Sequence, residues 1–293
     1  MGRTARRRPA FADPPPRPSL VRWSAIPAVT GLALLLVAAA CGSPAQRFSG
    51  RAAALGMRAE VVLGSGFQHV VFWQAGQPSR TLHVYIDGDG TPWVAGRPAE
   101  DPTPRNPLML SLMALDANPS VYLGRPCYHG LSKTPPCSSA LWTGERYSEA
   151  VVSSMQAAAR RILQSGAFDR VNWFGHSGGG TLAVLLAPRL PETAGIVTVA
   201  ANLDIDAWAH LHGYPRLDGS LNPAMQPPIP PRIHQRHYVG GEDPIIPPAI
   251  VARGPIDPAA LIVIPSYDHI CCWTARWPAI LTDLERATRP PAR

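Results

Sequence analysis

A short stretch in the middle of the chain, residues 171–187, constrains its fold most. An apolar run ends in Gly-His-Ser-Gly-Gly at residues 175–179, and an apolar helical pattern follows at once. This order predicts a strand, a sharp turn and a helix, with Ser177 at the apex of the turn. The glycines at positions 175 and 179 have a mechanical reason, because only residues without a side chain let strand and helix approach so closely.

The predicted turn holds the Ser177 hydroxyl above the edge of the sheet. The N-terminus of the following helix favours negative charge that develops there. A glycine-rich turn can contain a serine by chance, but a strand before it and a helix after it favour a catalytic nucleophile. A serine needs a histidine base, which in turn needs a carboxylate to fix its tautomer.

Candidates for these two partners follow the last predicted strands. Asp243 comes after the strand over 233–239, and His269 comes after the strand over 260–264. Because the carboxyl ends of parallel strands meet at one edge of a sheet, both can reach Ser177. Asp204 and Asp206 also follow a strand and remain alternative acids, whereas Asp268 is adjacent to His269 and is unsuited to bond with it.

Strands and helices alternate along most of the chain, which predicts one mostly parallel central sheet flanked by helices. The first two strands are expected to be antiparallel. A stretch with five prolines, residues 222–231, is expected to form an irregular insertion before the acid-bearing strand, either as a cover over the substrate or as a plain surface loop. The predicted strands cover 61–63, 70–73, 82–86, 120–124, 171–175, 195–201, 233–239 and 260–264, and the predicted helices cover 106–117, 147–162 and 181–187.

The strand over 82–86 ends in Asp87-Gly88-Asp89-Gly90. Backbone N–H groups in such a loop can point at a substrate oxygen, and we expect an oxyanion loop here. A calcium loop is disfavoured because the series of acidic residues is incomplete.

Five cysteines raise the question of pairing. Cys127 and Cys137 are ten positions apart and suit a disulfide in an exported protein. A metal site with His129 lacks a fourth ligand. Cys271 and Cys272 form either a vicinal disulfide or two thiols.

The excess of basic over acidic residues is concentrated in the first 40 residues. The net charge is +7, and residues 1–40 alone hold six arginines against one aspartate. This placement argues for a targeting segment and against a nucleic-acid partner. A charge-free stretch follows, and three alanines lead to Cys41.

The arrangement resembles a bacterial lipoprotein signal, although Ala38 stands where leucine is usual. The resemblance implies export to the cell envelope and a membrane anchor through lipidated Cys41. A plain secretory signal and an uncleaved anchor are the alternatives. The expected organisation is a signal over 1–40, a flexible tether over 41–59, one domain over 60–287 and a tail over 288–293.

Several motifs together resemble one family. They are Tyr85-Ile86-Asp87-Gly88-Asp89-Gly90, Arg125-Pro126-Cys127, Arg146-Tyr147-Ser148, Gly175-His176-Ser177-Gly178-Gly179, Gly240-Gly241-Glu242-Asp243 and Asp268-His269-Ile270-Cys271-Cys272-Trp273. The chain is similar to α/β-hydrolases, and more narrowly to bacterial exported hydrolases of unassigned substrate. In that family the order of the triad is Ser, Asp, His, as here.

This resemblance implies a serine hydrolase without a metal or a cofactor. Ser177 would be the nucleophile, His269 the base and Asp243 the acid, and an oxyanion hole would form from Gly178, Asp89 and Gly88. The expected substrate is a small-molecule or lipid ester. A catalytically idle envelope module that binds through the same pocket is the alternative.

Overall fold

The computed structural model describes residues 42–166 and 168–289, so the predicted signal segment and Cys41 lie outside the described residues. Eight strands form one sheet in the order β1-β2-β6-β3-β7-β8-β9-β10. The neighbours from β6 to β10 are parallel, whereas β2 is antiparallel to both β1 and β6. The strands are β1 (Arg58–Leu63), β2 (Gln68–Gln74), β3 (Thr81–Ile86), β6 (Ser120–Leu123), β7 (Arg170–His176), β8 (Thr193–Val199), β9 (His234–Gly240) and β10 (Leu261–Ile264). The predicted mostly parallel sheet, with an antiparallel start, is therefore confirmed.

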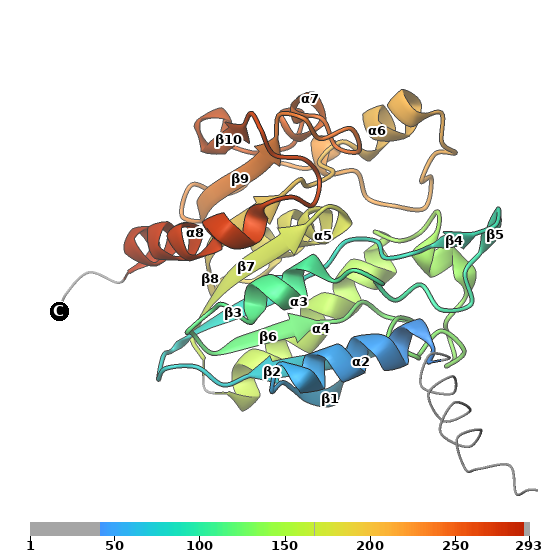
Figure 1. Ribbon diagram of the computed structural model, residues 1–293, viewed down its shortest axis with the longest axis horizontal. Coiled ribbons are helices and arrows are strands. Elements are labelled where there is room, and N and C mark those ends of the chain that lie inside the picture. Colours follow the sequence, from blue (N-terminus) through green and yellow to red (C-terminus); the bar gives the residue numbers. More distant parts are fainter. Residues whose placement is uncertain (1–41, 167, 290–293) are drawn as a thin grey trace, which may run out of the picture. The chain divides into compact units, whose positions relative to one another are not determined.

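Helices cover both faces of this sheet (Figure 1). One core cluster joins the sheet to α4 and α5, and a second joins it to α2, α3 and α8. The adjacent residues Trp173 and Phe174 on β7 belong to different clusters, because successive side chains of a strand point to opposite faces. This explains the continuous apolar run before the serine. The helices are α2 (Pro44–Ala54), α3 (Leu108–Met113), α4 (Glu149–Ser165), α5 (Gly178–Leu186), α6 (Ile205–His212), α7 (Pro248–Val251) and α8 (Trp273–Thr288).

The expected flexible tether over 41–59 is wrong for most of its length. Residues Pro44–Ala54 form helix α2, which Ser43 caps through a reciprocal bond with Gln46. The side chain of Phe48 is buried against the rings of Phe72 and Tyr122. The helix is thus part of the second core, and β1 begins at Arg58, two residues before the expected domain boundary.

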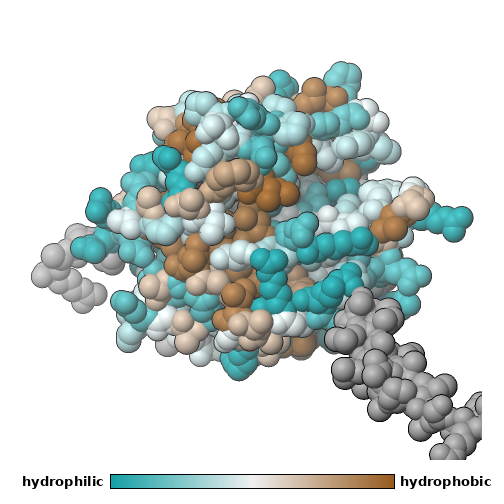
Figure 2. All heavy atoms as spheres, viewed as in Figure 1, coloured by the Kyte–Doolittle hydropathy of each residue, from teal (hydrophilic) through white to brown (hydrophobic). Residues whose placement is uncertain are grey.

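The other differences concern lengths and small elements. Helix α3 is shorter than the predicted 106–117, and α8 was not predicted because Pro278 interrupts its pattern. Residues 222–231 contain one short turn of 3₁₀ helix, Pro223–Met225, and are otherwise irregular, as expected. The two-stranded hairpin of β4 (Trp93–Val94) and β5 (Arg97–Pro98) projects from the surface at the right of Figures 1 and 2.

Within the described ranges, none of the helices has both the length and the apolar character needed to cross a membrane.

Candidate active site

Ser177 lies on the sharp turn between β7 and α5 that the sequence predicts. Its backbone has φ 52° and ψ −125°, a conformation that side-chain-bearing residues rarely adopt. Such strain costs roughly 1–3 kcal/mol and persists where the surroundings impose it. A Cβ on Gly175 would overlap the carbonyl group of Gly179, and a Cβ on Gly179 would overlap the carbonyl of Ile86. Both glycines of the motif are therefore required by close approach.

His269 and Asp243 meet in the loops that follow β10 and β9. The Nδ1–H of His269 donates to Oδ2 of Asp243 at 2.8 Å, and both side chains are buried. The other oxygen of this carboxylate accepts the backbone N–H groups of Ile245 and Ile246, each at 2.8 Å. With Nδ1 engaged and protonated, Nε2 of His269 is the nitrogen that can accept a proton.

The residue before the serine also holds the histidine. Nε2 of His176 donates to the backbone carbonyl of His269 at 2.9 Å, and the two ring centroids are 4.7 Å apart. His269 is therefore fixed by Asp243 at its ring and by His176 at its backbone. The sequence does not predict this role for His176. The position of His176 next to Ser177 is its only indication there.

Burial is the largest influence on His269 and lowers its pKa below 6.5. The hydrogen bond to Asp243 raises this pKa, whereas electrostatic repulsion from His176 lowers it. The imidazole is therefore neutral at pH 7 and able to accept a proton.

This shift gives a testable pH dependence. A base works only while it is deprotonated, so activity is lost as the pH falls through the folded-state pKa of His269. Because that pKa is lowered, we expect the acidic midpoint of the kcat/KM profile below pH 6.5. A stopped assay between pH 4 and 8 measures it, with circular dichroism at each pH as the control for unfolding. A midpoint above 6.5 in folded protein would contradict the assignment of His269.

The alternative acids have other partners. Asp204 accepts the backbone N–H of Ala207 at 3.1 Å as the N-cap of α6, and Arg253 donates to it at 2.6 Å. Asp206 accepts from the side chain of Asn222 at 3.0 Å. Asp243 is thus the candidate carboxylate that the structure brings to His269.

The predicted oxyanion loop lies against the serine. A Cβ added to Gly88 would stand 3.3 Å from Cβ of Ser177. The N–H of Gly88 donates to Oδ1 of Asp87 at 3.1 Å and is already engaged. Within residues 42–166 and 168–289, the N–H groups of Asp89 and Gly178 have no protein acceptor. Of the three expected donors, this favours Asp89 and Gly178 over Gly88.

A cavity of about 1080 Å³ lies over this arrangement and includes Ser177 and His269 in its lining. Trp208 and His212 of α6 both donate to the carbonyl of Ile245, at 3.1 and 2.8 Å, and so tie one wall to the loop that carries Asp243. Six large aromatic and aliphatic side chains line the cavity: Trp93, Trp208, Tyr214, Leu217, Ile245 and Ile270. Three arginines also line it: Arg105, Arg146 and Arg216.

The cysteine predictions have two outcomes. Cys127 and Cys137 form the expected disulfide, with Cα atoms 5.5 Å apart, and are therefore unavailable as metal ligands beside His129. Cys271 and Cys272, which the sequence left open, are joined as a vicinal disulfide.

Comparisons with solved structures identify the fold. A Mycobacterium tuberculosis puromycin-hydrolysing peptidase is 14% identical, with a TM-score of 0.54 over 81% of this chain and 40% of that chain. A Pyrococcus horikoshii acylaminoacyl peptidase is 12% identical, with a TM-score of 0.57 over 81% and 42%. A Pyrococcus furiosus esterase is 10% identical, with a TM-score of 0.55 over 81% and 93%.

This chain therefore spans less than half the length of the two peptidases and matches nearly all of the esterase. No family model and no curated protein matches the sequence. The sheet order, the turn at Ser177 and these structural neighbours together show that the chain has the α/β-hydrolase fold.

Proposed function

We propose that this protein is a serine hydrolase that cleaves carboxylic esters through an acyl-enzyme. The observation that carries the proposal is the buried pair of His269 and Asp243 in the same cavity as the strained Ser177. The backbone N–H groups of Asp89 and Gly178, which have no acceptor among the residues that the structure describes, complete the parts that acyl transfer requires.

The proposed reaction has two halves. Oγ of Ser177 attacks the ester carbonyl while Nε2 of His269 takes its proton, and Asp243 stabilises the resulting imidazolium. The N–H groups of Asp89 and Gly178 stabilise the oxyanion of the tetrahedral intermediate. His269 then returns the proton to the leaving alcohol. Water repeats the same steps on the acyl-enzyme, which frees the acid and restores the serine.

Two features favour an ester with a sizeable apolar part. The cavity is large, and six large aromatic and aliphatic side chains are among the residues that line it. The chain also matches 93% of the Pyrococcus furiosus esterase but only 40% and 42% of the two peptidases, which have long additional regions.

A series of p-nitrophenyl esters from acetyl to palmitoyl tests the proposal and measures the acyl preference. The p-nitroanilides of the same acids serve as matched amides. We expect saturable hydrolysis of the esters and slower hydrolysis of the amides. If no ester is hydrolysed faster by the wild type than by Ser177→Ala, the protein is not an esterase and the binding-module alternative gains support.

The proposed location is the cell envelope, with an anchor at lipidated Cys41. The signal-like segment before Cys41 supports export, and so does the disulfide between Cys127 and Cys137, because such bonds persist in oxidising compartments.

Replacing Cys41 with serine tests the anchor. We expect the wild type in the membrane fraction and Cys41→Ser in the soluble exported fraction or retained as precursor. Globomycin should block processing of the wild type, and Cys137→Ser, which removes another cysteine, should still pellet with membranes. Membrane association that is unchanged by both Cys41→Ser and globomycin would rule out lipidation.

A further inference from the structure

The side chain of Asp89 has no role in the mechanism above, yet this partly buried carboxylate is surrounded by the buried side chains of Arg125, Arg146 and Tyr147. We propose that Asp89 is a positioning residue: Arg125, Arg146 and Tyr147 hold its carboxylate and thereby fix its own backbone N–H in the oxyanion hole. We call these three side chains and Asp89 the Asp89 clamp. The inference rests on the proposed serine-hydrolase function.

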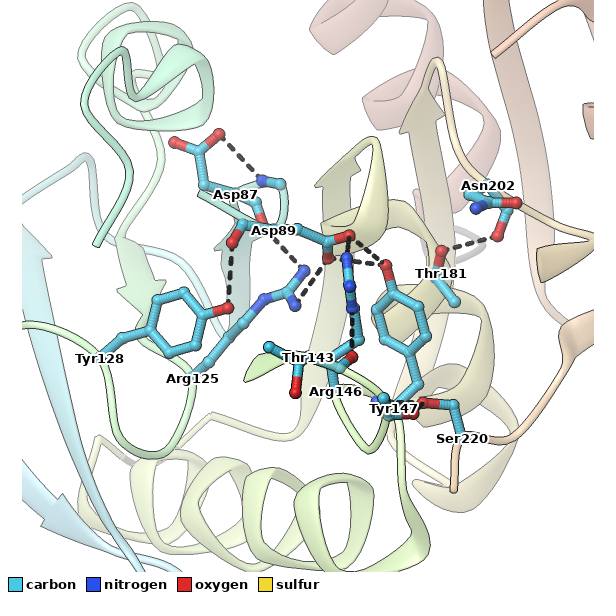
Figure 3. A network of polar contacts seen from close by, with 12 residues as sticks. Asp87, Asp89, Arg125, Tyr128, Thr143, Arg146, Tyr147, Thr181, Asn202 and Ser220 are labelled. Atoms are coloured by element: carbon cyan, nitrogen blue, oxygen red, sulfur yellow. Dashed lines mark hydrogen bonds and ion pairs between the residues drawn. The ribbon is translucent and has the colours of Figure 1, made fainter. Parts of the chain in front are cut away.

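Three side chains converge on the carboxylate of Asp89 (Figure 3). Nη1 of Arg125 lies 2.9 Å from Oδ1, and Nη1 of Arg146 lies 2.8 Å from Oδ2. The hydroxyl of Tyr147 lies 2.6 Å from Oδ1 and 2.7 Å from Oδ2. The hydroxyl of Tyr128 donates to the carbonyl of Asp89 at 3.0 Å. Both the carboxylate and the backbone carbonyl of Asp89 are therefore held by neighbouring side chains.

The clamp also reaches the second oxyanion donor. A Cβ on Gly178 would overlap both Oδ1 of Asp89 and the hydroxyl of Tyr147. The carboxylate thus packs directly against the first residue of α5, whose N–H is the other half of the proposed oxyanion hole. One partly buried carboxylate in this way sets the spacing between the two donors.

The segments that supply the clamp are themselves restrained. Arg125 follows β6 and stands two residues before Cys127, which is bonded to Cys137. Arg146 and Tyr147 directly precede Ser148, the N-cap of α4. Rigid support is what a site needs when a displacement of less than 1 Å in a donor weakens its bond to the transition state.

The electrostatics favour a functional role over a purely stabilising one. Two buried guanidinium groups surround one carboxylate, and removing such charges from water offsets most of what their attraction contributes to stability. Burial raises the pKa of Asp89, but the charges of Arg146 and Arg125 outweigh it and lower the pKa to about 2, so the carboxylate is charged at any working pH. The excess positive charge lies beside the loop where the oxyanion develops, and Arg146 lines the cavity.

The test compares three variants with the wild type. Tyr147→Phe removes one hydroxyl from the clamp, and Arg146→Lys keeps the charge but changes the fork of donors. Tyr85→Phe is the matched control, because it removes a buried tyrosine hydroxyl that donates to another carboxylate, Asp116, at 2.5 Å. Measured quantities are kcat and KM on the best ester, Tm, and Ki for a trifluoromethyl ketone, which forms an oxyanion-bearing adduct with the serine.

Complete removal of an oxyanion donor lowers kcat roughly 10²- to 10³-fold. Displacing the donor should cause part of that loss. We expect kcat of Tyr147→Phe to fall about 10- to 100-fold, with a smaller fall for Arg146→Lys and KM nearly unchanged in both. Ki for the ketone should rise by the factor by which kcat/KM falls. Tyr85→Phe should lower Tm by about as much as Tyr147→Phe does, and it should leave kcat unchanged.

Three results would overturn the inference: an unchanged kcat in both clamp variants, an effect on KM alone, or an equal loss of activity in Tyr85→Phe, which would indicate general destabilisation. A wild type that neither hydrolyses esters nor binds the ketone would overturn the proposed function and the clamp together. An active wild type with unaffected clamp variants would overturn the clamp alone.

Discussion

Ser177→Ala is expected to abolish turnover. Without the hydroxyl no acyl-enzyme forms, and in serine hydrolases the loss of the nucleophile lowers kcat by about 10⁶-fold. The measurement is ester hydrolysis with enzyme concentrations high enough to detect the residual rate. Ser266→Ala is the matched control, since Ser266 is exposed and stands only three residues before His269. It should retain wild-type activity.

A second substitution at the same position separates chemistry from stability. Ser177 has positive φ, which glycine adopts without strain and alanine does not. We expect Ser177→Gly to be as inactive as Ser177→Ala but about 1 kcal/mol more stable in urea unfolding, within the roughly 1–3 kcal/mol that such strain stores. Activity above a tenth of wild type in either variant would contradict the proposed mechanism.

Asp243→Asn is expected to have the second-largest effect, a loss of about 10⁴-fold in kcat. The amide would present N–H to Nδ1 of His269, which would leave the proton on Nε2 and turn the base toward Ser177 as a donor. Asp204→Asn is the matched control, because it makes the same chemical change at a carboxylate that bonds Arg253 and caps α6. It should lower stability and leave kcat within a few-fold.

Steady-state kinetics on both variants, with urea unfolding to compare their stabilities, decide between the two acids. If Asp204→Asn loses activity and Asp243→Asn keeps it, Asp204 is the acid of the triad and Asp243 is not.

The local pattern of the sequence predicted the sheet correctly and proposed the three residues of the candidate triad. Apolar runs in strands that are buried on both faces, such as the run that contains Trp173 and Phe174, leave little ambiguity about the type of secondary structure. Each candidate residue follows a strand, and parallel strands bring their carboxyl ends together whatever the lengths of the connections between them.

Helix α2 escaped prediction for a physical reason. In α2 the buried positions are small or isolated, namely Ala45, Phe48 and Ala52, and arginines and a glycine stand between them. The stability of this helix therefore comes from one phenylalanine ring in a pocket of other rings, which no local average of hydrophobicity registers. Ser43 and Gln46, three residues apart, were the available sign of its start.

The Asp89 clamp could not be derived from the sequence. Its members Arg146 and Tyr147 lie 57 and 58 residues from Asp89, and nothing in the local pattern links them. The motifs that contain them resemble those of a family, but this resemblance implies no role for the two residues. Only the packed structure shows that the charges of two arginines fall on one carboxylate beside the serine.

The most direct measurement is the covalent labelling of the folded protein with a fluorophosphonate, followed by peptide mapping. We expect one adduct per chain, located on Ser177, and none in Ser177→Ala at equal protein concentration. Labelling of His269→Ala should be slowed by orders of magnitude, since the nucleophile then lacks its base. Equal labelling of the wild type and Ser177→Ala, or an adduct on another residue, would contradict the assignment of Ser177 as a catalytic nucleophile.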